Sequence, residues 1–337
     1  SMLDCDQYKL NPEYQRRRRW SQTQQSKLIE SLIINVPIPP VFLYEYDYSQ
    51  YEVMDGLQRL TAIREFYDNV FPLEGLDQWS ELNGKTYNQL PEQVRKGIDR
   101  RYISSIILLK ETAKTDADAQ KLKQLVFERI NSGGVHLSEQ ESRNALYPGC
   151  LNSLSIQLAE NDKFKKMWSM DDSEESSIER NERYAKMEDV ELVLRFFAYR
   201  HIDKWENMTL KQFLDKFLMI GNSFPDSVLS SYKILFNKTI DLLYGLYGSD
   251  AFKIMRKRGD NWILYDRPTK VIYDPLMMAI SNYVESSDTL LSKKDLIQKD
   301  TYDLQKEQYQ ILGGRNTNKK DVIERYDILN KFFQKYI

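Results

Sequence analysis

At 337 residues, with 41% apolar and 12% aromatic residues, the chain is long enough for two domains and can bury a sizeable core. Its net charge of -2 excludes a protein that binds polyanions over its whole surface, although 48 Lys and Arg leave room for local basic patches. Cys5 and Cys150 form no disulfide framework and fit a cytoplasmic location. No apolar run reaches the roughly 18 residues of a membrane helix.

The first part of the chain mixes short strands with helices. In chain order, the pattern predicts a helix over residues 20–35 that Ser21 caps, strands over 41–44 and 51–54, a helix over 56–69 and a strand over 102–109. Three prolines, at positions 37, 39 and 40, end the first helix. Because strands and helices are mixed in so short a stretch, we expect residues 1–114 to form an α+β domain.

The second part is mainly helical in pattern, since β-branched runs largely disappear after Lys114. Helical spacing of apolar residues covers 117–130, 139–158, 186–199, 210–219, 228–246 and 322–336. Residues 171–182 are acidic and lack a period, which predicts an exposed loop. We therefore expect residues 115–337 to form a mainly α-helical domain.

The corner between the second strand and its helix, Asp55-Gly56-Leu57-Gln58-Arg59, has two interpretations. In the first, Asp55 caps the helix and Gln58, three positions later, completes a capping box. In the second, the corner binds phosphate: Gly56 lets the backbone approach a ligand, the first-turn N–H groups attract an anion, and Arg59 donates to phosphate oxygens. The capping box leaves Gly56 and Arg59 unexplained, so the residue pattern keeps both interpretations open.

Two further stretches are candidate binding sites. Gly133 suits the left-handed position after a helix, yet the pair Gly133-Gly134 beside Asn131 also offers a loop of free N–H groups to an anion. The other stretch is a run of arginines next to Trp20, which is either a solvated face or a contact for a nucleic-acid backbone. The run consists of Arg16, Arg17, Arg18 and Arg19.

Several familiar sites are excluded by their residues. His136 and His201 are the two histidines of the chain, too few for a three-His zinc site or an HNH-type nuclease. Residues 83–86 resemble the end of a P-loop, but Trp79 stands where that pattern needs glycine. The carboxylates between 171 and 175 lie in the aperiodic stretch and are typical of a solvated tip rather than a metal site.

Five separated stretches match one family in the same order. They are NPEYQRRRRW, LIESLIINVPIPPVFLYE, VMDGLQRLTAI, FERINSGGVHLSEQESRNA and GGRNTNKKDVIERYDIL. The chain resembles the GmrSD-type restriction-endonuclease N-terminal domain family, whose first part has a ParB/sulfiredoxin-like fold. The resemblance runs from about Tyr8 to the C-terminus.

The resemblance implies a role in prokaryotic defence against phage or modified DNA. It also implies that nucleotide is bound and hydrolysed at an Asp-Gly-Gln-Gln-Arg motif, which falls here on Asp55, Gly56, Gln58 and Arg59. Leu57 stands where the family usually has glutamine, so hydrolysis is less firmly implied than binding.

Two other family motifs find counterparts in the chain. Arg16 corresponds to the arginine of a Tyr-Gln-Arg stretch, and Asn131, Gly133 and Gly134 correspond to an Asn-x-Gly-Gly turn. Members of the family often carry an HNH domain, which this chain lacks the histidines to form. We therefore expect any nuclease to be another protein or a part of the protein that this sequence does not include.

The residues and the resemblance together lead us to expect an NTP-hydrolysing sensor or regulator of a defence system. Asp55 is the expected ligand of a Mg²⁺ ion, and Arg17, Arg18 and Arg19 are the expected DNA contacts. The expected partners are DNA, a nuclease or other defence protein, and further copies of the chain. The alternative is a DNA-binding or adaptor protein that does not hydrolyse nucleotide, and a third option is a free-standing nuclease.

Overall fold

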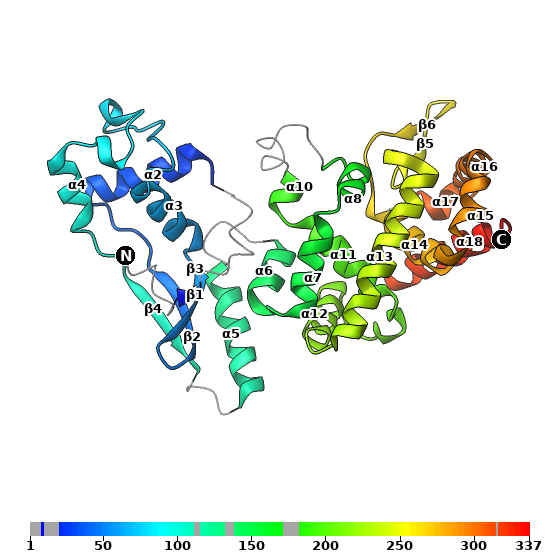
Figure 1. Ribbon diagram of the computed structural model, residues 1–337, viewed down its shortest axis with the longest axis horizontal. Helices are drawn as coiled ribbons and strands as arrows, with labels where there is room; N and C mark the ends of the chain where they lie inside the picture. Colours follow the sequence, from blue (N-terminus) through cyan, green and yellow to red (C-terminus); the bar gives the residue numbers. More distant parts are fainter. Residues whose placement is uncertain (1–7, 10–19, 111–114, 132–137, 171–181, 315) are drawn as a thin grey trace. The chain divides into compact units, whose positions relative to one another are not determined.

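The computed structural model describes residues 8–9, 20–110, 115–131, 138–170, 182–314 and 316–337 (Figure 1). It forms two compact units, Ser1–Ser138 and Glu139–Ile337. The first is mixed α+β and the second is largely helical, which confirms the predicted fold class. The units divide after helix α5 (Asp116–Asn131), whereas the predicted division precedes it, because α5 packs on strand β3 (Gln50–Asp55) of the first unit.

The first unit is built on a four-stranded sheet with the order β1-β3-β2-β4. The other strands are β1 (Tyr8–Lys9), β2 (Val41–Asp47) and β4 (Ser105–Leu109). β2 and β3 form an antiparallel hairpin, to which β1 and β4 add in parallel on either side. The hairpin therefore lies in the centre of the sheet, and the end of β3 is surrounded by neighbouring elements.

Three helices of the first unit enclose its apolar core at one end of the sheet (Figure 1). They are α2 (Gln22–Ile34), α3 (Leu57–Tyr67) and α4 (Glu92–Asp99), joined by 3-10 turns at Ser80–Leu82 and Tyr87–Gln89. The core consists of Ile29, Leu32, Phe66, Phe71, Leu73, Leu76, Leu82, Leu90 and Ile98. The predicted cap at Ser21 is confirmed, since its hydroxyl accepts from Gln24 N–H while the Gln24 amide oxygen accepts from Ser21 N–H.

The second unit packs its helices around one apolar core. The helices are α6 (Glu139–Leu146), α7 (Cys150–Ala159), α8 (Asp162–Met167), α10 (Glu182–Ala185), α11 (Glu188–Tyr199), α12 (Leu210–Gly221), α13 (Asp226–Tyr247), α14 (Lys270–Ile280), α15 (Ser287–Ser292), α16 (Lys294–Glu307), α17 (Tyr309–Leu312) and α18 (Lys319–Gln334). Short 3-10 turns lie at Ile202–Lys204, Gly248–Asp250 and Ser281–Ser286. One antiparallel hairpin, β5 (Ile254–Arg258) with β6 (Asn261–Tyr265), completes the unit.

Helix α11 runs through the centre of this core and is apolar on almost every side. It packs against α7, α12 and α14. Two buried arginines nevertheless form ion pairs at this helix, one on α11 and one on α6. Arg195 of α11 pairs with Asp274 of α14, and Arg143 of α6 pairs with Glu191 of α11 at 3.0 Å and with Asp215 of α12 at 2.8 Å.

The second unit differs from the expected pattern in several places, and helices such as α14 and α16 lie outside every predicted range. The single helix predicted over 139–158 is two helices, because Pro148 and Gly149 separate α6 from α7. The helix predicted from residue 186 begins at Glu188, since Met187 has a left-handed φ of 56°. The hairpin β5–β6 was not predicted. Of the predicted loop over 171–182, all but the last residue lies outside the described residues.

No helix in the part of the chain that the structure describes is both long and apolar enough to cross a membrane.

Candidate functional site

Strand β3 passes into helix α3 at the corner that the sequence singles out. Asp55 is the last residue of the strand and pairs with Phe42 of β2. Gly56, rather than Asp55, is the N-cap of α3, and no side chain makes a capping hydrogen bond there. The predicted capping box of Asp55 and Gln58 is therefore wrong, because Asp55 remains in the sheet and its carboxylate has another partner.

Gly56 is required by the fold itself. Its φ of +96° lies in the left-handed region, which residues with a side chain rarely adopt. A Cβ on Gly56 would also lie only 2.5 Å from Cγ1 of Val41, the first residue of β2. The turn geometry and the close approach of β2 thus explain this glycine without a bound ligand.

Arg59 binds three oxygen atoms of the protein. Its Nη2 donates to Asp55 Oδ2 at 2.6 Å, and its Nη1 donates to the carbonyl oxygens of Pro39 and Pro40, the latter at 3.3 Å. The Arg59 side chain is 12% exposed, against 37% for Asp55. The guanidinium therefore joins the end of β3, the first turn of α3 and the segment that leads into β2.

Gln58 differs from its neighbours because its amide is available. It is half-buried in the first turn of α3 and makes no hydrogen bond within the described part of the chain. The first hydrogen bond of the helix runs from Leu60 N–H to Gly56 O at 2.9 Å. The N–H groups of residues 57 to 59 therefore precede the helical ladder and, with the positive end of the helix dipole, favour an anion.

A buried ion pair that sequence reasoning missed lies next to the corner. Lys123 of α5 donates to Glu52 of β3 at 2.6 Å, and their side chains are 6% and 14% exposed. The Lys123 ammonium also lies 5.1 Å from the centre of the Tyr44 ring. A signal was present in the sequence, because Lys123 lies between Ala119 and Phe127 at four-residue spacing and so shares their buried face.

This ion pair fixes α5 on the sheet close to Asp55, which lies three residues after Glu52. The helix ends at Asn131, where the predicted Asn-x-Gly-Gly turn begins. Gly133, Gly134 and the four arginines from Arg16 to Arg19 lie outside the described residues, as does the Asn131 side chain. Of the predicted site, the structure therefore brings together Asp55, Gly56, Gln58 and Arg59.

Two common kinds of functional site are built from metal ligands and from histidine side chains. Among the described residues, no group of three or more His, Cys, Asp or Glu side chains is placed to hold a metal ion. His201 shares a hydrogen bond of 2.9 Å with the Tyr232 hydroxyl and lies against the Phe217 ring, which is a packing role. His136 and the carboxylates between 171 and 175 lie outside the described residues.

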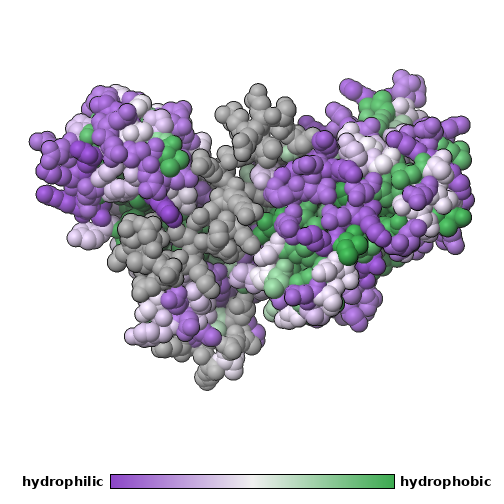
Figure 2. Space-filling view, in the orientation of Figure 1, coloured by the Kyte–Doolittle hydropathy of each residue, from purple (hydrophilic) through white to green (hydrophobic). Residues whose placement is uncertain are grey.

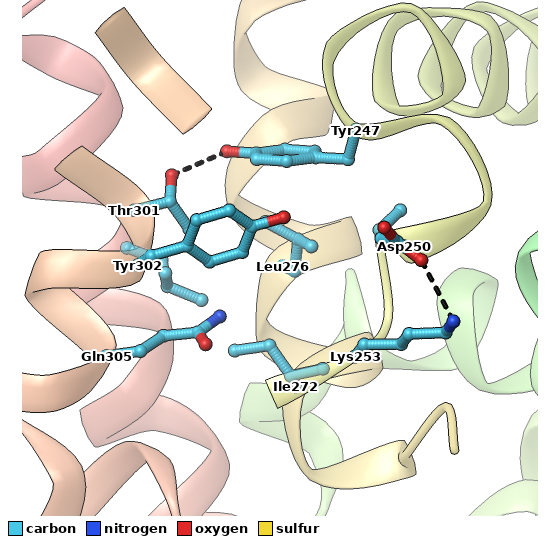
Figure 3. A pocket seen from close by; sticks show the side chains of 10 residues that line it. Tyr247, Asp250, Lys253, Ile272, Leu276, Thr301, Tyr302 and Gln305 are labelled. Carbon is cyan, nitrogen blue, oxygen red and sulfur yellow. Dashed lines mark hydrogen bonds and ion pairs between the residues drawn. The ribbon is translucent and has the colours of Figure 1, made fainter. Parts of the chain in front are cut away.

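A small cavity lies in the second unit, between the end of α13, helix α14 and helix α16 (Figure 3). Its volume is about 10 Å³, the space of a single water molecule. Tyr247 and Thr301 share a hydrogen bond of 2.8 Å on its wall, and Lys253 pairs with Asp250 at 2.9 Å. The cavity is too small for a nucleotide, so we assign it to packing.

Comparison with known proteins identifies the region of the chain in which the corner lies. Residues 1–148 match the family described as GmrSD restriction endonuclease, N-terminal domain. The match includes the corner and the Asn131–Gly134 stretch, but it ends before the C-terminal stretch over 313–329, so it covers less of the chain than the predicted resemblance. No curated protein and no solved structure gives a match. Residues 1–148 of this chain are a GmrSD restriction endonuclease N-terminal domain.

Proposed function

We propose that the corner formed by Asp55, Gly56, Gln58 and Arg59 binds the phosphate groups of a nucleoside triphosphate. The observation that carries this proposal is the first turn of α3. There, N–H groups outside the helical ladder lie beside the Gln58 amide, which has no hydrogen-bond partner among the described residues. The corner belongs to a restriction-system domain, so the chain acts as a nucleotide-responsive component of such a system.

Arg59 has a positioning role in this proposal. Its guanidinium is occupied by Asp55 and by the carbonyl groups of Pro39 and Pro40, so it holds the corner in shape while adding a positive charge beneath it. The direct contacts to phosphate come from the N–H groups and from Gln58.

Asp55 is the residue that would hold a Mg²⁺ ion. Its carboxylate is 37% exposed and its partner among the described side chains is Arg59, which engages Oδ2 and leaves Oδ1 to coordinate. Glu52, the nearest other carboxylate on β3, is occupied by Lys123. One carboxylate fits Mg²⁺, which usually takes one or two protein ligands and completes its shell with phosphate and water, and which neutralises developing phosphate charge.

Hydrolysis of the nucleotide is the expected reaction, and Gln58 is the side chain that would orient the attacking water. Leu57, half-buried at the first helical position, contributes no polar group beside it. The rival function, a DNA-binding or adaptor protein without turnover, is favoured by this leucine and by the closed Asp55–Arg59 pair. The two functions differ in one measurable quantity, which is phosphate release at saturating nucleotide.

The test is a titration of the full chain with each of the four NTPs, with and without Mg²⁺ and DNA, followed by product analysis. Gln58→Leu should weaken binding of the preferred NTP about tenfold, the size of one hydrogen bond to a charged group. Arg59→Ala should abolish binding, because the corner loses both its charge and its shape.

Arg64→Ala is the matched control, since Arg64 lies on the same helix and its side chain is 46% exposed. It should bind nucleotide like the unmodified chain. Unchanged NTP affinity in both Gln58→Leu and Arg59→Ala, or no binding of any NTP by the unmodified chain, would refute the proposal. Binding without phosphate release would select the adaptor function.

A further inference from the structure

The hairpin β5–β6 extends from the helices of the second unit (Figure 1). Near its base, Met255 N–H donates to the side-chain oxygen of Gln305 at 2.8 Å. Closer to the tip, Trp262, which pairs with Lys257, meets the Tyr309 ring edge to face at 5.1 Å. Gly259, with a φ of +62°, opens the two-residue turn at its tip. The hairpin is thus held against the helices along its length, whereas a Cβ built on Gly259 would meet no atom within 4 Å, so the turn itself is open.

The charged side chains of this ribbon are mainly basic. Arg256, Lys257 and Arg258 are consecutive on β5, and Asp260 at the tip is the one acidic residue between Ile254 and Tyr265. Lys257 and Arg258 are exposed and, within the described part of the chain, have no ion-pair partner. Exposed lysines elsewhere in the second unit, such as Lys216 and Lys331, also have no ion-pair partner among the described residues, so the distinct feature here is the run of three consecutive basic residues on one strand.

The nearest acidic residue at the base of the ribbon is already neutralised. Asp266, which follows β6, pairs with Lys253 at 2.7 Å, and Lys253 also pairs with Asp250 at 2.9 Å. Arg267, next to Asp266, is exposed and has no ion-pair partner among the described residues. The positive charge of the ribbon therefore extends from its tip to its base.

One face of the ribbon combines charge with an aromatic ring. Antiparallel pairing places Arg256 opposite Ile263 and Arg258 opposite Asn261, so these four side chains share a face with Tyr265. The Arg256 guanidinium lies 5.0 Å from the centre of the Tyr265 ring, which limits its motion. Figure 2 shows the surface at this end of the unit as mostly hydrophilic, with a small hydrophobic patch.

We propose that the β5–β6 hairpin is a contact element for double-stranded DNA. The major groove of B-DNA, about 12 Å wide, admits a two-stranded β-ribbon, and unpaired Arg and Lys side chains along its edges release counterions from the phosphates. The deep, narrow major groove of an RNA duplex does not admit it. An acidic peptide would satisfy the charges, but it would not require a projecting ribbon with basic residues from tip to base.

This inference does not rest on the proposed nucleotide site, because the hairpin belongs to the second unit and the corner to the first. It assigns DNA contact to residues outside the family match, which ends at residue 148. The hairpin is also a different part of the chain from the arginine run at 16–19, which the sequence alone suggests as a DNA contact.

The experiment measures binding of the full chain to a short fluorescein-labelled DNA duplex by anisotropy over a range of salt concentrations. Removing one side chain that binds a phosphate should reduce the slope of log affinity against log salt by about one unit, and affinity near 0.1 M salt by about tenfold. Lys257→Gln with Arg258→Gln should therefore reduce the slope by about two units. Asp260→Asn should act in the opposite direction and tighten binding.

The matched control removes two other exposed charges of the same unit, by Lys216→Gln with Lys331→Gln. This control should keep the affinity and slope of the unmodified chain, and the double hairpin variant should keep its NTP affinity and melting temperature. The inference is overturned if the unmodified chain does not bind duplex DNA, or if the hairpin and control variants bind it equally. An RNA duplex bound as tightly as DNA overturns the groove assignment.

Discussion

Lys123 and Glu52, which are 71 positions apart in the sequence, form a buried ion pair with a 2.6 Å contact between Nζ and Oε2. The pair joins α5 to the strand that ends at the candidate site. Both charges are almost completely removed from water, so either charge without its partner would destabilise the fold. The position of α5 on the sheet therefore depends on this contact.

Removing one partner of this pair should destabilise the first unit strongly. We expect Lys123→Met to lower the free energy of unfolding by about 3 kcal/mol or more, because Glu52 is left buried and unpaired. Adding Glu52→Leu should recover most of the loss, since two apolar residues leave no charge behind. Urea unfolding measures both variants.

The exposed pair Lys96–Glu92 is the control, with an equally short contact of 2.6 Å but side chains 64% and 69% exposed. Lys96→Met should change the free energy of unfolding by less than about 1 kcal/mol. If Lys123→Met with Glu52→Leu is as unstable as Lys123→Met alone, the unpaired charge of Glu52 is not the cause of the instability.

Gly56→Ala should destabilise the fold for two reasons that can be separated. The positive φ costs about 1 kcal/mol for alanine, and the contact with Val41 at 2.5 Å adds overpacking of about 1–3 kcal/mol. Gly84→Ala, at a φ of +82° with no atom within 4 Å of the added Cβ, should show the first cost alone.

A double-mutant cycle with Val41→Ala isolates the contact between Gly56 and Val41. Alanine at position 41 removes the Cγ1 atom that the new Cβ would meet, so the double variant should be less unstable than the sum of the single variants. Strictly additive free energies of unfolding would show that the close approach of Val41 does not require glycine.

Glu191 should make the stability of the second unit depend on acidic pH. Burial raises the pKa of Glu191, but the charges of Lys270, Arg143 and Arg195 outweigh it and lower the pKa from 4.5 to about 2. Because the folded pKa lies below the unfolded one, the stabilisation is complete above pH 4.5 and is lost as pH falls toward 2. A shift of this size is worth about 3 kcal/mol.

The measurement compares urea unfolding of Glu191→Gln with that of the unmodified chain at neutral and acidic pH. The loss caused by Glu191→Gln should be large at pH 7 and should shrink as pH falls through the window given above. Glu188→Gln is the control on the same helix, because Glu188 is 33% exposed and its contact with Lys270 is 3.9 Å. A loss that is the same at every pH would contradict the assignment.

Replacing Tyr199 with phenylalanine should stabilise the fold. Its hydroxyl is buried without a hydrogen-bond partner among the described residues, while its ring stacks on Trp205 and Phe213 at 5.9 and 6.5 Å. An unsatisfied buried hydroxyl costs free energy, so Tyr199→Phe should raise the free energy of unfolding by about 1 kcal/mol. Tyr247→Phe, which loses the 2.8 Å hydrogen bond to Thr301, should lower it by a similar amount. In thermal unfolding, we expect a higher melting temperature for Tyr199→Phe and a lower one for Tyr247→Phe. Equal losses of stability in the two variants would refute the prediction.

Local features of the first unit could be predicted from the sequence. The Ser21–Gln24 capping box depends on atoms within three residues, and the change from alternating to helical spacing after Met54 correctly placed the corner. The hairpin β5–β6 was missed because its β5 strand is basic and short, and its apolar residues suffice for packing only once α16 and α17 lie beneath it. The spacing of Lys123 from Ala119 and Phe127 indicated that it is buried. Nothing in the sequence indicated that Glu52 is its partner.

The sequence by itself determined where the candidate site begins, because strand and helix periodicities are properties of neighbouring residues. It also placed Gln58 and Arg59 in the first turn of the helix, three and four positions after Asp55, which suits either a capping box or an ion pair. Only the tertiary structure decided between these partners. The carbonyl groups of Pro39 and Pro40 hold the Arg59 guanidinium where it captures Asp55, and the approach of Val41 requires Gly56 as the cap. Such contacts join segments distant in the chain, so no spacing within the motif could reveal them.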